Sequence, residues 1–459
     1  MQPIYAPGVL SPAECQGWIA RLSAAGMQDP SPAYPPSYRN NDRRVIDDLA
    51  AGQALFERVR SLAPPTWVDA EGTTWTLESL NPRLRACRYR PGQRFTRHRD
   101  GPFFPGGGRR SMLSLVMYLD QGFEGGHTRF FASQTSPEVT WDLVPSVGAA
   151  AIFPHDLWHE GQEVHSGLKH VLRSDLVYRP LTPPPRETGH QGYVWCVLPL
   201  ADGTILSGGR DGQILSWVEG RAVSSAAAAP GSVLGLVERD DGIIASTTRA
   251  GVLSLWRRNG PVLQRIFQGP IDDGALLCAA ALPGGRLVIG TTRGELLSID
   301  GSGQVTARKR AHRGWVWGLA AASSGALASV GEDGGLCIHG ADGSVACAQA
   351  PRSLRAVCAD EANAGWITGD SEGQLERWRD GRSTLLGRRP AAITSVAVDP
   401  SGRVASGDEA GCAAILGATE EVFEHGDFVR CVRFTQDGAL ATASYDGRAR
   451  VLRGGEAVS

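Results

Sequence analysis

The pattern of apolar and polar residues changes in character near residue 185. Before that point, the segment SPAECQGWIARLSAAG predicts an amphipathic helix that opens with a capping box and ends at Gly26. A second helix is expected over residues 48–61. Runs such as MLSLVMYLD and HVLRSDLVYR then favour strands. We therefore expect an all-β core over residues 82–180, carried by one or two helices.

One phrase recurs in the second part of the chain: an apolar strand, a glycine turn, a strand of small residues, a second glycine turn and a third strand. YVWCVLPLADGTILSGGRDGQILSW and FVRCVRFTQDGALATASYDGRARVL are two of the copies. The glycines of the second turn recur on average about every 39 residues, the length of a four-stranded propeller blade. They are Gly212, Gly251, Gly294, Gly334, Gly373, Gly411 and Gly447. Seven blades that close into a ring leave no exposed sheet edge.

The whole chain is therefore expected to be mainly β, with two domains. Residues 1–180 form the first domain, 181–187 a Pro-rich linker, and 188–459 a seven-bladed β-propeller. The repeats resemble the WD40 family. That resemblance implies that an aspartate in the second turn bonds a histidine that precedes its blade, which is a structural role. The expected pairs are His190 with Asp211, His312 with Asp333, and His425 with Asp446.

Composition limits the classes of partner. The chain of 459 residues has 46 basic and 48 acidic residues and a net charge of −2, so bulk electrostatic binding to nucleic acid or a membrane is disfavoured. No run of eighteen apolar residues predicts a membrane helix, and the first residues lack the pattern of a secretory signal. The nine cysteines show no CxxC spacing. We expect a cytoplasmic protein that binds no membrane.

Three polar residues stand out against the β background of the first domain. His98 and Asp100 form a His-x-Asp motif, and His159 follows in FPHDLWHEG. Two imidazoles and one carboxylate, with the remaining positions open, are the ligand set of non-haem Fe(II) oxygenases. Lys169 and Arg173 share one face of the following strand, where a buried cation needs an anionic partner. The far carboxylate of 2-oxoglutarate is one such partner.

Residues 82–180 resemble the 2-oxoglutarate- and Fe(II)-dependent dioxygenases of the prolyl 4-hydroxylase type. The phrases that carry the resemblance are RYRPGQRFTRHRDG, LSLVMYLDQGFEGGHTRFF, GAAAIFPHDLWHEG and VHSGLKHVLRSDLVY. It implies a double-stranded β-helix, or jelly roll, that uses Fe(II), 2-oxoglutarate and O2 to hydroxylate a C–H bond. Family members commonly rely on ascorbate as a reductant, and the same is expected here.

The resemblance also assigns roles to individual residues. It makes His98, Asp100 and His159 the iron ligands. Lys169 matches the residue that binds the C5 carboxylate of 2-oxoglutarate, and Arg173 remains its rival. The residues expected to line the co-substrate pocket are Tyr89, Tyr118 and Thr128. The histidines expected at the surface are His127, which has the opposite strand parity to Thr128, and His155, His165 and His170.

The sequence leaves several classes of substrate open. A C-terminal propeller favours a docked protein or peptide, with proline as the default residue by analogy. In the loop 30–44, Arg39, Asn41 and Arg43 are candidate substrate contacts, and a solvated loop is the alternative. Two further classes stay open. One is a hydroxylase of a small molecule or of nucleic acid, the latter suggested by an arginine cluster over residues 83–99. The other is a propeller-based binding protein with a degenerate oxygenase domain.

Overall fold

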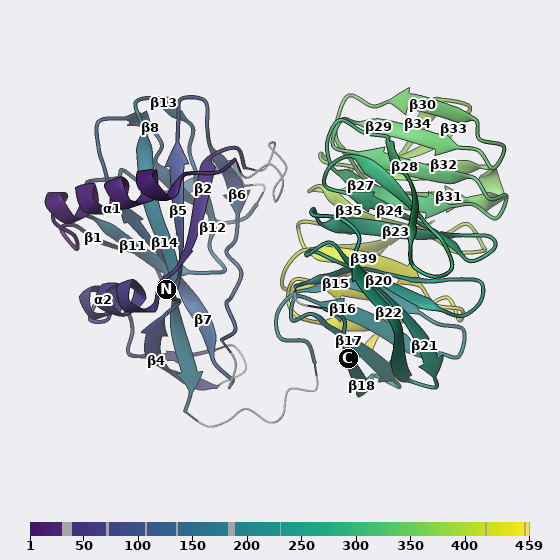
Figure 1. Cartoon of the computed structure of the whole chain (residues 1–459), viewed down its shortest axis with the longest axis horizontal. Coiled ribbons are helices and arrows are strands. Elements are labelled where there is room, and N and C mark those ends of the chain that lie inside the picture. Colours follow the sequence, from purple (N-terminus) through teal and green to yellow (C-terminus); the bar gives the residue numbers. More distant parts are fainter. Residues whose placement is uncertain are drawn as a thin grey trace. The chain divides into compact units, whose positions relative to one another are not determined.

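The chain folds into two compact units, residues 1–186 and 187–459, in the computed structural model (Figure 1). The structure describes residues 1–29, 39–69, 73–105, 108–134, 136–181, 189–229, 231–417, 420–453 and 456–458. Most of the expected linker, residues 182–187, lies outside the described residues.

Two helices lie on one face of a large sheet in the N-terminal unit (Figure 1). Helix α1 (Pro12–Ala25) begins with the expected capping box, in which Ser11 Oγ accepts from Glu14 N and Glu14 Oε2 accepts from Ser11 N at 2.8 Å. Helix α2 is Leu49–Val59. The helix residues buried against the sheet include Cys15, Leu22, Leu55 and Val59. Within the described part of the chain, no helix is long and apolar enough to cross a membrane.

The large sheet has eight strands, in the order β1-β11-β7-β14-β4-β3, with β5 pairing β14 and β2. Its strands are β1 (Ile4–Ala6), β2 (Asp42–Asp47), β3 (Thr66–Val68), β4 (Thr74–Leu80), β5 (Arg83–Tyr89), β7 (Arg110–Tyr118), β11 (Ala150–Pro154) and β14 (Lys169–Pro180). A second sheet, in the order β10-β9-β12-β6, contains β6 (Phe95–His98), β9 (Thr128–Phe131), β10 (Val139–Leu143) and β12 (Trp158–Gly161). A short pair joins β8 (Glu124–Gly125) to β13 (Val164–Ser166).

Alternation along the strands of the large sheet creates two cores. Leu113, Leu115 and Met117 of β7 pack with the helices, whereas Val116 and Tyr118 belong to a second cluster. That second cluster also contains Phe95 of β6 and Phe130 of β9, from the smaller sheet. Because successive side chains of a strand point to opposite faces, one strand serves both layers. The space between the two sheets is the interior of the predicted jelly roll, and it receives the polar residues considered below.

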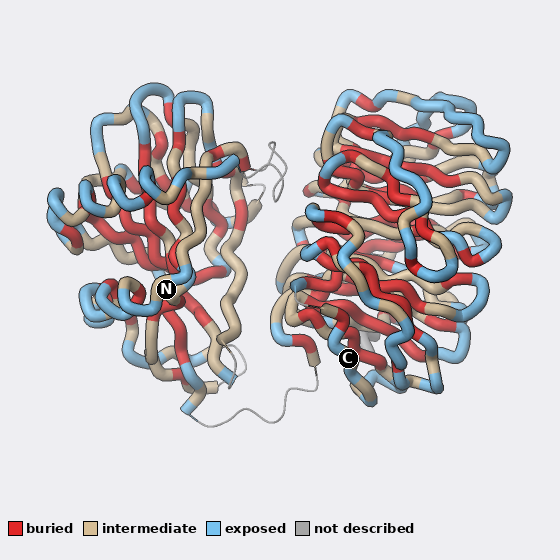
Figure 2. The backbone as a smooth tube through the Cα atoms, in the orientation of Figure 1, coloured by how far each residue is buried: buried red, intermediate tan, exposed pale blue. Residues whose placement is uncertain are grey.

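The C-terminal unit is the expected seven-bladed propeller. Each blade is a sheet of four consecutive strands; the blades span residues 194–227, 233–270, 276–310, 316–349, 354–388, 393–424 and 429–458. The innermost strands are β15 (Val194–Pro199), β19 (Val233–Glu238), β23 (Leu276–Leu282), β27 (Val316–Ala321), β31 (Leu354–Asp360), β35 (Ile393–Val398) and β39 (Val429–Phe434). Each of these contacts the next around the ring, and β39 contacts β15. Figure 2 shows that the buried segments run through the blades, whereas many turns are exposed.

Hydrogen bonds between histidines and turn aspartates fix three of the blades. The Nδ1 atoms of His190, His312 and His425 lie 3.1, 2.9 and 3.2 Å from carboxylate oxygens of their predicted partners, Asp211, Asp333 and Asp446. The Nε2 atom of His312 also lies 2.9 Å from Ser329 Oγ. The expected pairing of these residues is therefore confirmed. A disulfide joins Cys337 to Cys347 across two paired strands of the fourth blade, and the spacing of the cysteines did not predict it.

We expect His312→Ala to lower the free energy of unfolding of the propeller by about 2 to 3 kcal/mol, because it removes two hydrogen bonds in a buried site. Chemical denaturation followed by tryptophan fluorescence measures the change. His165→Ala is the control, because His165 is exposed and its loss should change stability by less than about 0.5 kcal/mol. Equal stability of the two variants would contradict the structural role.

Candidate metal centre

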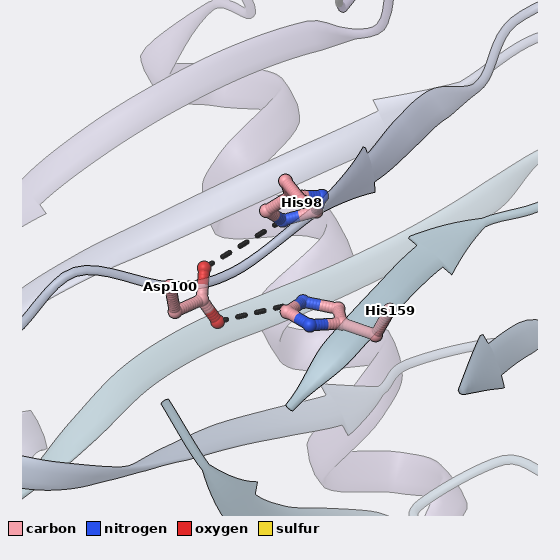
Figure 3. A group of neighbouring side chains, drawn as sticks. All are labelled: His98, Asp100 and His159. Carbon is pink, nitrogen blue, oxygen red and sulfur yellow. Dashed lines mark ion pairs between the residues drawn. The ribbon is translucent and has the colours of Figure 1, made fainter. Parts of the chain in front are cut away.

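The smaller sheet brings His98, Asp100 and His159 together. His98 is the last residue of β6 and stands directly opposite His159 of β12 in the antiparallel register, so the two imidazoles leave the sheet side by side. Their ring centroids are 4.2 Å apart. Asp100 follows two residues after β6 ends, and its carboxylate turns back toward both rings (Figure 3). The three potential ligand atoms lie within 4.8 Å of one another.

The hydrogen bonds of each imidazole leave its Nε2 atom for a metal. His98 Nδ1 lies 2.7 Å from the carbonyl oxygen of Thr96, and His159 Nδ1 lies 2.9 Å from that of Leu157. A carbonyl oxygen only accepts, so each Nδ1 carries the proton and each Nε2 keeps its lone pair in the neutral ring. Each Nε2 is 3.6 Å from an oxygen of Asp100. Burial lowers the pKa of His98, and that of His159 to about 3, which keeps both rings neutral at pH 7.

The Asp100 carboxylate is held by two donors. Arg173 Nη2 donates to both oxygens, at 2.5 and 2.6 Å, and Ser114 Oγ donates to Oδ2 at 2.6 Å. Burial would raise the pKa of the Asp100 carboxyl, but Arg173 and the two imidazoles hold that pKa well below its ordinary value. The group is therefore an anion at neutral pH, as a metal ligand must be.

A chain of hydrogen bonds reaches Asp100 through His155, which the sequence analysis placed at the surface. That expectation is wrong for His155 and for His170, which are buried. Ser111 Oγ lies 2.8 Å from His155 Nε2, and His155 Nδ1 lies 2.9 Å from Ser114 Oγ. Ser114 uses its only hydrogen on the carboxylate, so His155 Nδ1 must donate to it and His155 Nε2 must accept from Ser111. The chain fixes the orientation of Ser114 and, through it, that of Asp100.

The other cation of the predicted site, Lys169, lies at a different point of the same interior. It stands opposite Tyr89 in the pairing of β14 with β5, and its Nζ is 5.1 Å from that ring and 5.7 Å from the ring of Tyr118. Tyr118 Oη is 2.8 Å from Thr128 Oγ1. The ammonium donates to the carbonyl of Gly126 at 2.6 Å, and among the described residues no carboxylate forms an ion pair with it. Burial lowers its pKa to about 8.

The three candidate substrate contacts differ in how deeply they are buried. Arg39 and Asn41 are buried, at 3% and 0% exposed, and Arg43 is half-buried in β2. Arg39 donates through Nε to Asn41 Oδ1 at 2.7 Å and through Nη2 to Cys87 Sγ at 2.8 Å. It also lies over the ring of Phe95, which stacks on the imidazole of His98 at 3.6 Å. Arg39 is thus linked to the metal centre through the ring of Phe95. Phe95 was not among the residues expected in the site.

Comparison with known proteins agrees with this geometry. A family model described as the 2OG-Fe(II) oxygenase superfamily matches residues 84–173, and a model of the WD domain, G-beta repeat, matches residues 183–217 and 418–452. The chain therefore combines a domain of the 2OG-Fe(II) oxygenase superfamily with a WD40 propeller. That superfamily implies Fe(II), 2-oxoglutarate and O2.

Two curated proteins are similar to part of the chain. The ciliary WD repeat-containing protein ctxp80 of Euplotoides octocarinatus is 25% identical over 260 residues, which cover 55% of this chain and 34% of that protein. The echinoderm microtubule-associated protein-like 3 of Mus musculus is 28% identical over 190 residues, which cover 37% and 21%. The chain thus spans 34% and 21% of the length of these relatives.

Two solved structures are similar to part of the chain. The WD40 repeats of RRP9 and the structure of U3-55K each align with a TM-score of 0.49, at 20% and 19% identity. Each alignment covers 55% of this chain, and 88% and 89% of those chains.

The donor set fits an Fe(II) ion. Two neutral Nε2 atoms and one carboxylate oxygen would offer three ligands, and this is the donor set of non-haem Fe(II) centres that keep positions open. Lys169 supplies a buried positive charge in the same unit. A metal ligand that receives hydrogen bonds from its surroundings is orientated and tuned by them, so Ser114 is part of the site.

We expect Ser114→Ala to weaken the binding of Fe(II), or of Mn(II) as a stable substitute, by about tenfold, because the variant removes one of the two donors to Asp100. Calorimetric titration of the metal under anaerobic conditions measures the affinity without any turnover. Ser166→Ala, at an exposed serine of the same unit, is the matched control and should bind metal like the wild type. Unchanged affinity in Ser114→Ala would show that the hydrogen-bond chain does not support the ligand.

Proposed function

We propose that this chain is an Fe(II)- and 2-oxoglutarate-dependent dioxygenase that hydroxylates a C–H bond of a protein or peptide side chain. In this proposal residues 1–180 form the catalytic domain and residues 188–459 dock the substrate or a partner. The observation that carries the proposal is the convergence of His98, Asp100 and His159 inside the jelly roll, with all three ligand atoms within 4.8 Å. An intact ligand set argues against a degenerate oxygenase domain.

The bound metal would supply oxidative decarboxylation of 2-oxoglutarate coupled to transfer of one oxygen atom to the substrate. The protein's residues hold and shield that centre. His98 and His159 bind through Nε2 while backbone carbonyls fix their rings. Phe153 packs edge-on against His159 at 4.7 Å and Phe95 stacks on His98, so apolar rings cover the imidazoles and exclude water. Asp100 offsets part of the charge of the metal.

Lys169 is the residue that we propose for the C5 carboxylate of 2-oxoglutarate. Its ammonium bonds only a neutral carbonyl oxygen in the described structure, between two tyrosine rings. The rival, Arg173, is already paired with Asp100 through both carboxylate oxygens. A buried cation without a carboxylate favours a dianionic co-substrate, because the ion pair repays its desolvation. Tyr89, Tyr118 and Thr128 would line the same pocket.

Within the superfamily, we assign the catalytic domain to the prolyl 4-hydroxylase type on the basis of sequence resemblance. The proposal includes ascorbate as the reductant, by analogy with the family, and a cytoplasmic location, which rests on the cysteine pattern of the sequence. Substrate contacts are proposed for Arg39, Asn41 and Arg43; the burial of the first two favours a role in shaping the wall next to the reacting carbon.

Nucleic acid is the weaker alternative substrate. Five arginines of the cluster over residues 83–99 form ion pairs with carboxylates of the same unit: Arg83 with Asp47, Arg85 with Asp175, Arg88 and Arg90 with Asp42, and Arg94 with Glu163. Guanidinium groups neutralised in this way contribute less to a phosphate-binding stripe. A small-molecule substrate remains an alternative, and it would leave the propeller without a role in turnover.

His159→Ala is expected to abolish release of succinate from 2-oxoglutarate while leaving the fold intact, because the side chain lies at the metal centre. Succinate is measured by mass spectrometry, and circular dichroism and thermal unfolding report the fold. His165→Ala, at an exposed histidine, should keep full turnover. Succinate release by the His159→Ala protein at the wild-type rate would contradict the assignment of the ligands.

The affinity for 2-oxoglutarate should depend on pH through Lys169. Its folded pKa is lowered to about 8, so the charged form that pairs with the co-substrate is present below pH 8 and is lost above it. We expect the dissociation constant to be constant below about pH 8 and to rise by up to tenfold for each pH unit above it. Equilibrium binding under anaerobic conditions measures this profile.

Lys169→Arg is the matched control for the profile, since a guanidinium stays charged over this range and should remove the pH dependence. Lys169→Met should weaken binding at every pH. A flat profile in the wild type, together with unchanged binding in Lys169→Met, would move the assignment to Arg173.

A further inference from the structure

An irregularity recurs at the same place in every blade of the propeller. In each innermost strand the register with the next strand shifts around the second residue, so that this residue has no partner in the ladder. A bulge of this kind re-aims a side chain. The seven residues are Trp195, Leu234, Leu277, Trp317, Arg355, Thr394 and Arg430, and all are half-buried. We call this set the bulge ring.

Side chains of the bulge ring meet across the centre of the propeller. The guanidinium of Arg430, in the seventh blade, lies 5.9 Å from the ring of Trp195 in the first blade and 5.7 Å from that of Trp317 in the fourth. The fourth and seventh blades are not neighbours, so this second contact spans the central channel. Arg355, in the fifth blade, lies 4.3 Å from the ring of Trp317. The bulges therefore direct these side chains into one mouth of the channel.

The bulge ring carries two positive charges and no acid. Arg355 and Arg430 both approach the ring of Trp317, and among the described residues neither forms an ion pair with a carboxylate. Arg355 Nε and Trp195 Nε1 are buried donors without a hydrogen-bond partner there. Three acids lie nearby: Glu332 accepts from Trp317 Nε1 at 2.6 Å, and burial together with the charges of Glu409 and Asp427 raises the pKa of Tyr445. Two guanidinium groups lie against the same indole ring, beside donors that lack acceptors. This arrangement forms a site for an anion.

Aromatic rings extend this site along one side. Tyr445 stacks on Tyr193 at 4.2 Å and packs against Trp195 at 4.9 Å. The guanidinium of Arg210 lies 5.0 Å from the ring of Tyr193. A free inorganic anion would use the two arginines but not this apolar surface. An extended polypeptide uses both, because an acidic side chain can reach the arginines while its neighbours pack on the rings. Buried tryptophan, tyrosine and arginine are the residues that dominate binding energy at protein interfaces.

We propose that the mouth of the channel binds an acidic segment of a partner polypeptide, with an aspartate or glutamate carboxylate bridging Arg355 and Arg430. This inference deepens the docking role proposed above and rests on it. The rings of Trp195, Tyr193 and Tyr445 pack against the residues that flank the acidic side chain. The partner is recognised by its negative charge beside an apolar or aromatic residue.

The test uses the full chain and a displayed library of random twelve-residue peptides. We expect the selected peptides to be enriched in aspartate and glutamate relative to the input library. Their affinity, measured by fluorescence polarisation with synthetic copies, should fall at least tenfold for the double variant Arg355→Gln/Arg430→Gln. Peptides in which Asp and Glu are replaced by Asn and Gln should bind the wild type as weakly as the acidic peptides bind that variant.

The matched control removes the same charge elsewhere on the propeller. Arg221→Gln/Arg382→Gln changes two exposed arginines on the outermost strands of the first and fifth blades and should bind like the wild type. If the channel variant unfolds at a lower temperature than the control, the pair Arg355→Lys/Arg430→Lys replaces it. That pair keeps the charge but not the planar fork, and it should bind acidic peptides more weakly than the wild type and more tightly than their amide counterparts.

Three results would overturn the inference: a library that yields no binder, binders without acidic enrichment, or acidic binders unaffected by both channel variants. Binding of a single-stranded oligonucleotide that the channel variant abolishes, without peptide binding, would assign the site to nucleic acid instead. Succinate release in the absence of a protein substrate is measured in the same proteins. It should be equal in the wild type and the channel variant, so a failure of this inference is distinguishable from a failure of the oxygenase assignment.

Discussion

A carboxylate that is only 14% exposed, and on which four other groups converge, is the constraint that organises the N-terminal unit. Asp100 is charged at neutral pH although it is enclosed, and it stays charged because Arg173, Ser114 and two imidazoles surround it. An isolated carboxylate in such a place would cost several kcal/mol and would take up a proton instead. The sheet register that sets His98 opposite His159 therefore works together with a second set of contacts from β7 and β14.

This arrangement divides the two cations of the site between two tasks. Arg173 is occupied by Asp100 and so contributes to the position of a metal ligand. Lys169, four residues earlier on the same face of β14, keeps a charge that no described carboxylate offsets. The strand thus offers a cation for the metal ligand and a cation for a dianionic co-substrate. The proposed function depends on that division as much as on the ligands themselves.

Much of the site could be predicted because its residues are close in sequence or share a strand face. The His-x-Asp motif is local, and Lys169 and Arg173 alternate with apolar residues along β14. The parity of β9 also predicted that His127 points away from Thr128, and the structure pairs it with Asp142 at an exposed position. Arg39 and His155 could not be placed in this way. Their partners, Cys87 and Ser111, come from distant segments, and only the folded sheets bring them together.

The propeller shows the same division between local and long-range information. A repeat of fixed length predicted the number of blades and the histidine–aspartate pairs within them. The contact of Arg430 with Trp317 joins blades on different sides of the ring, so no feature of a single repeat could indicate it. Contacts of this kind distinguish one propeller from another, since the positions that repeat in every blade mainly close the ring.

Anaerobic absorption spectroscopy of the full chain, titrated with Fe(II) and 2-oxoglutarate, tests directly whether His98, Asp100 and His159 bind iron. Chelation of the ferrous ion by the 2-oxo acid produces a visible charge-transfer band that neither component gives alone. We expect this band to appear, to saturate at one metal per chain, and to be absent from Asp100→Ala. A wild-type protein that gives no band with both components present would contradict the central claim that these three residues form an iron centre open to the co-substrate.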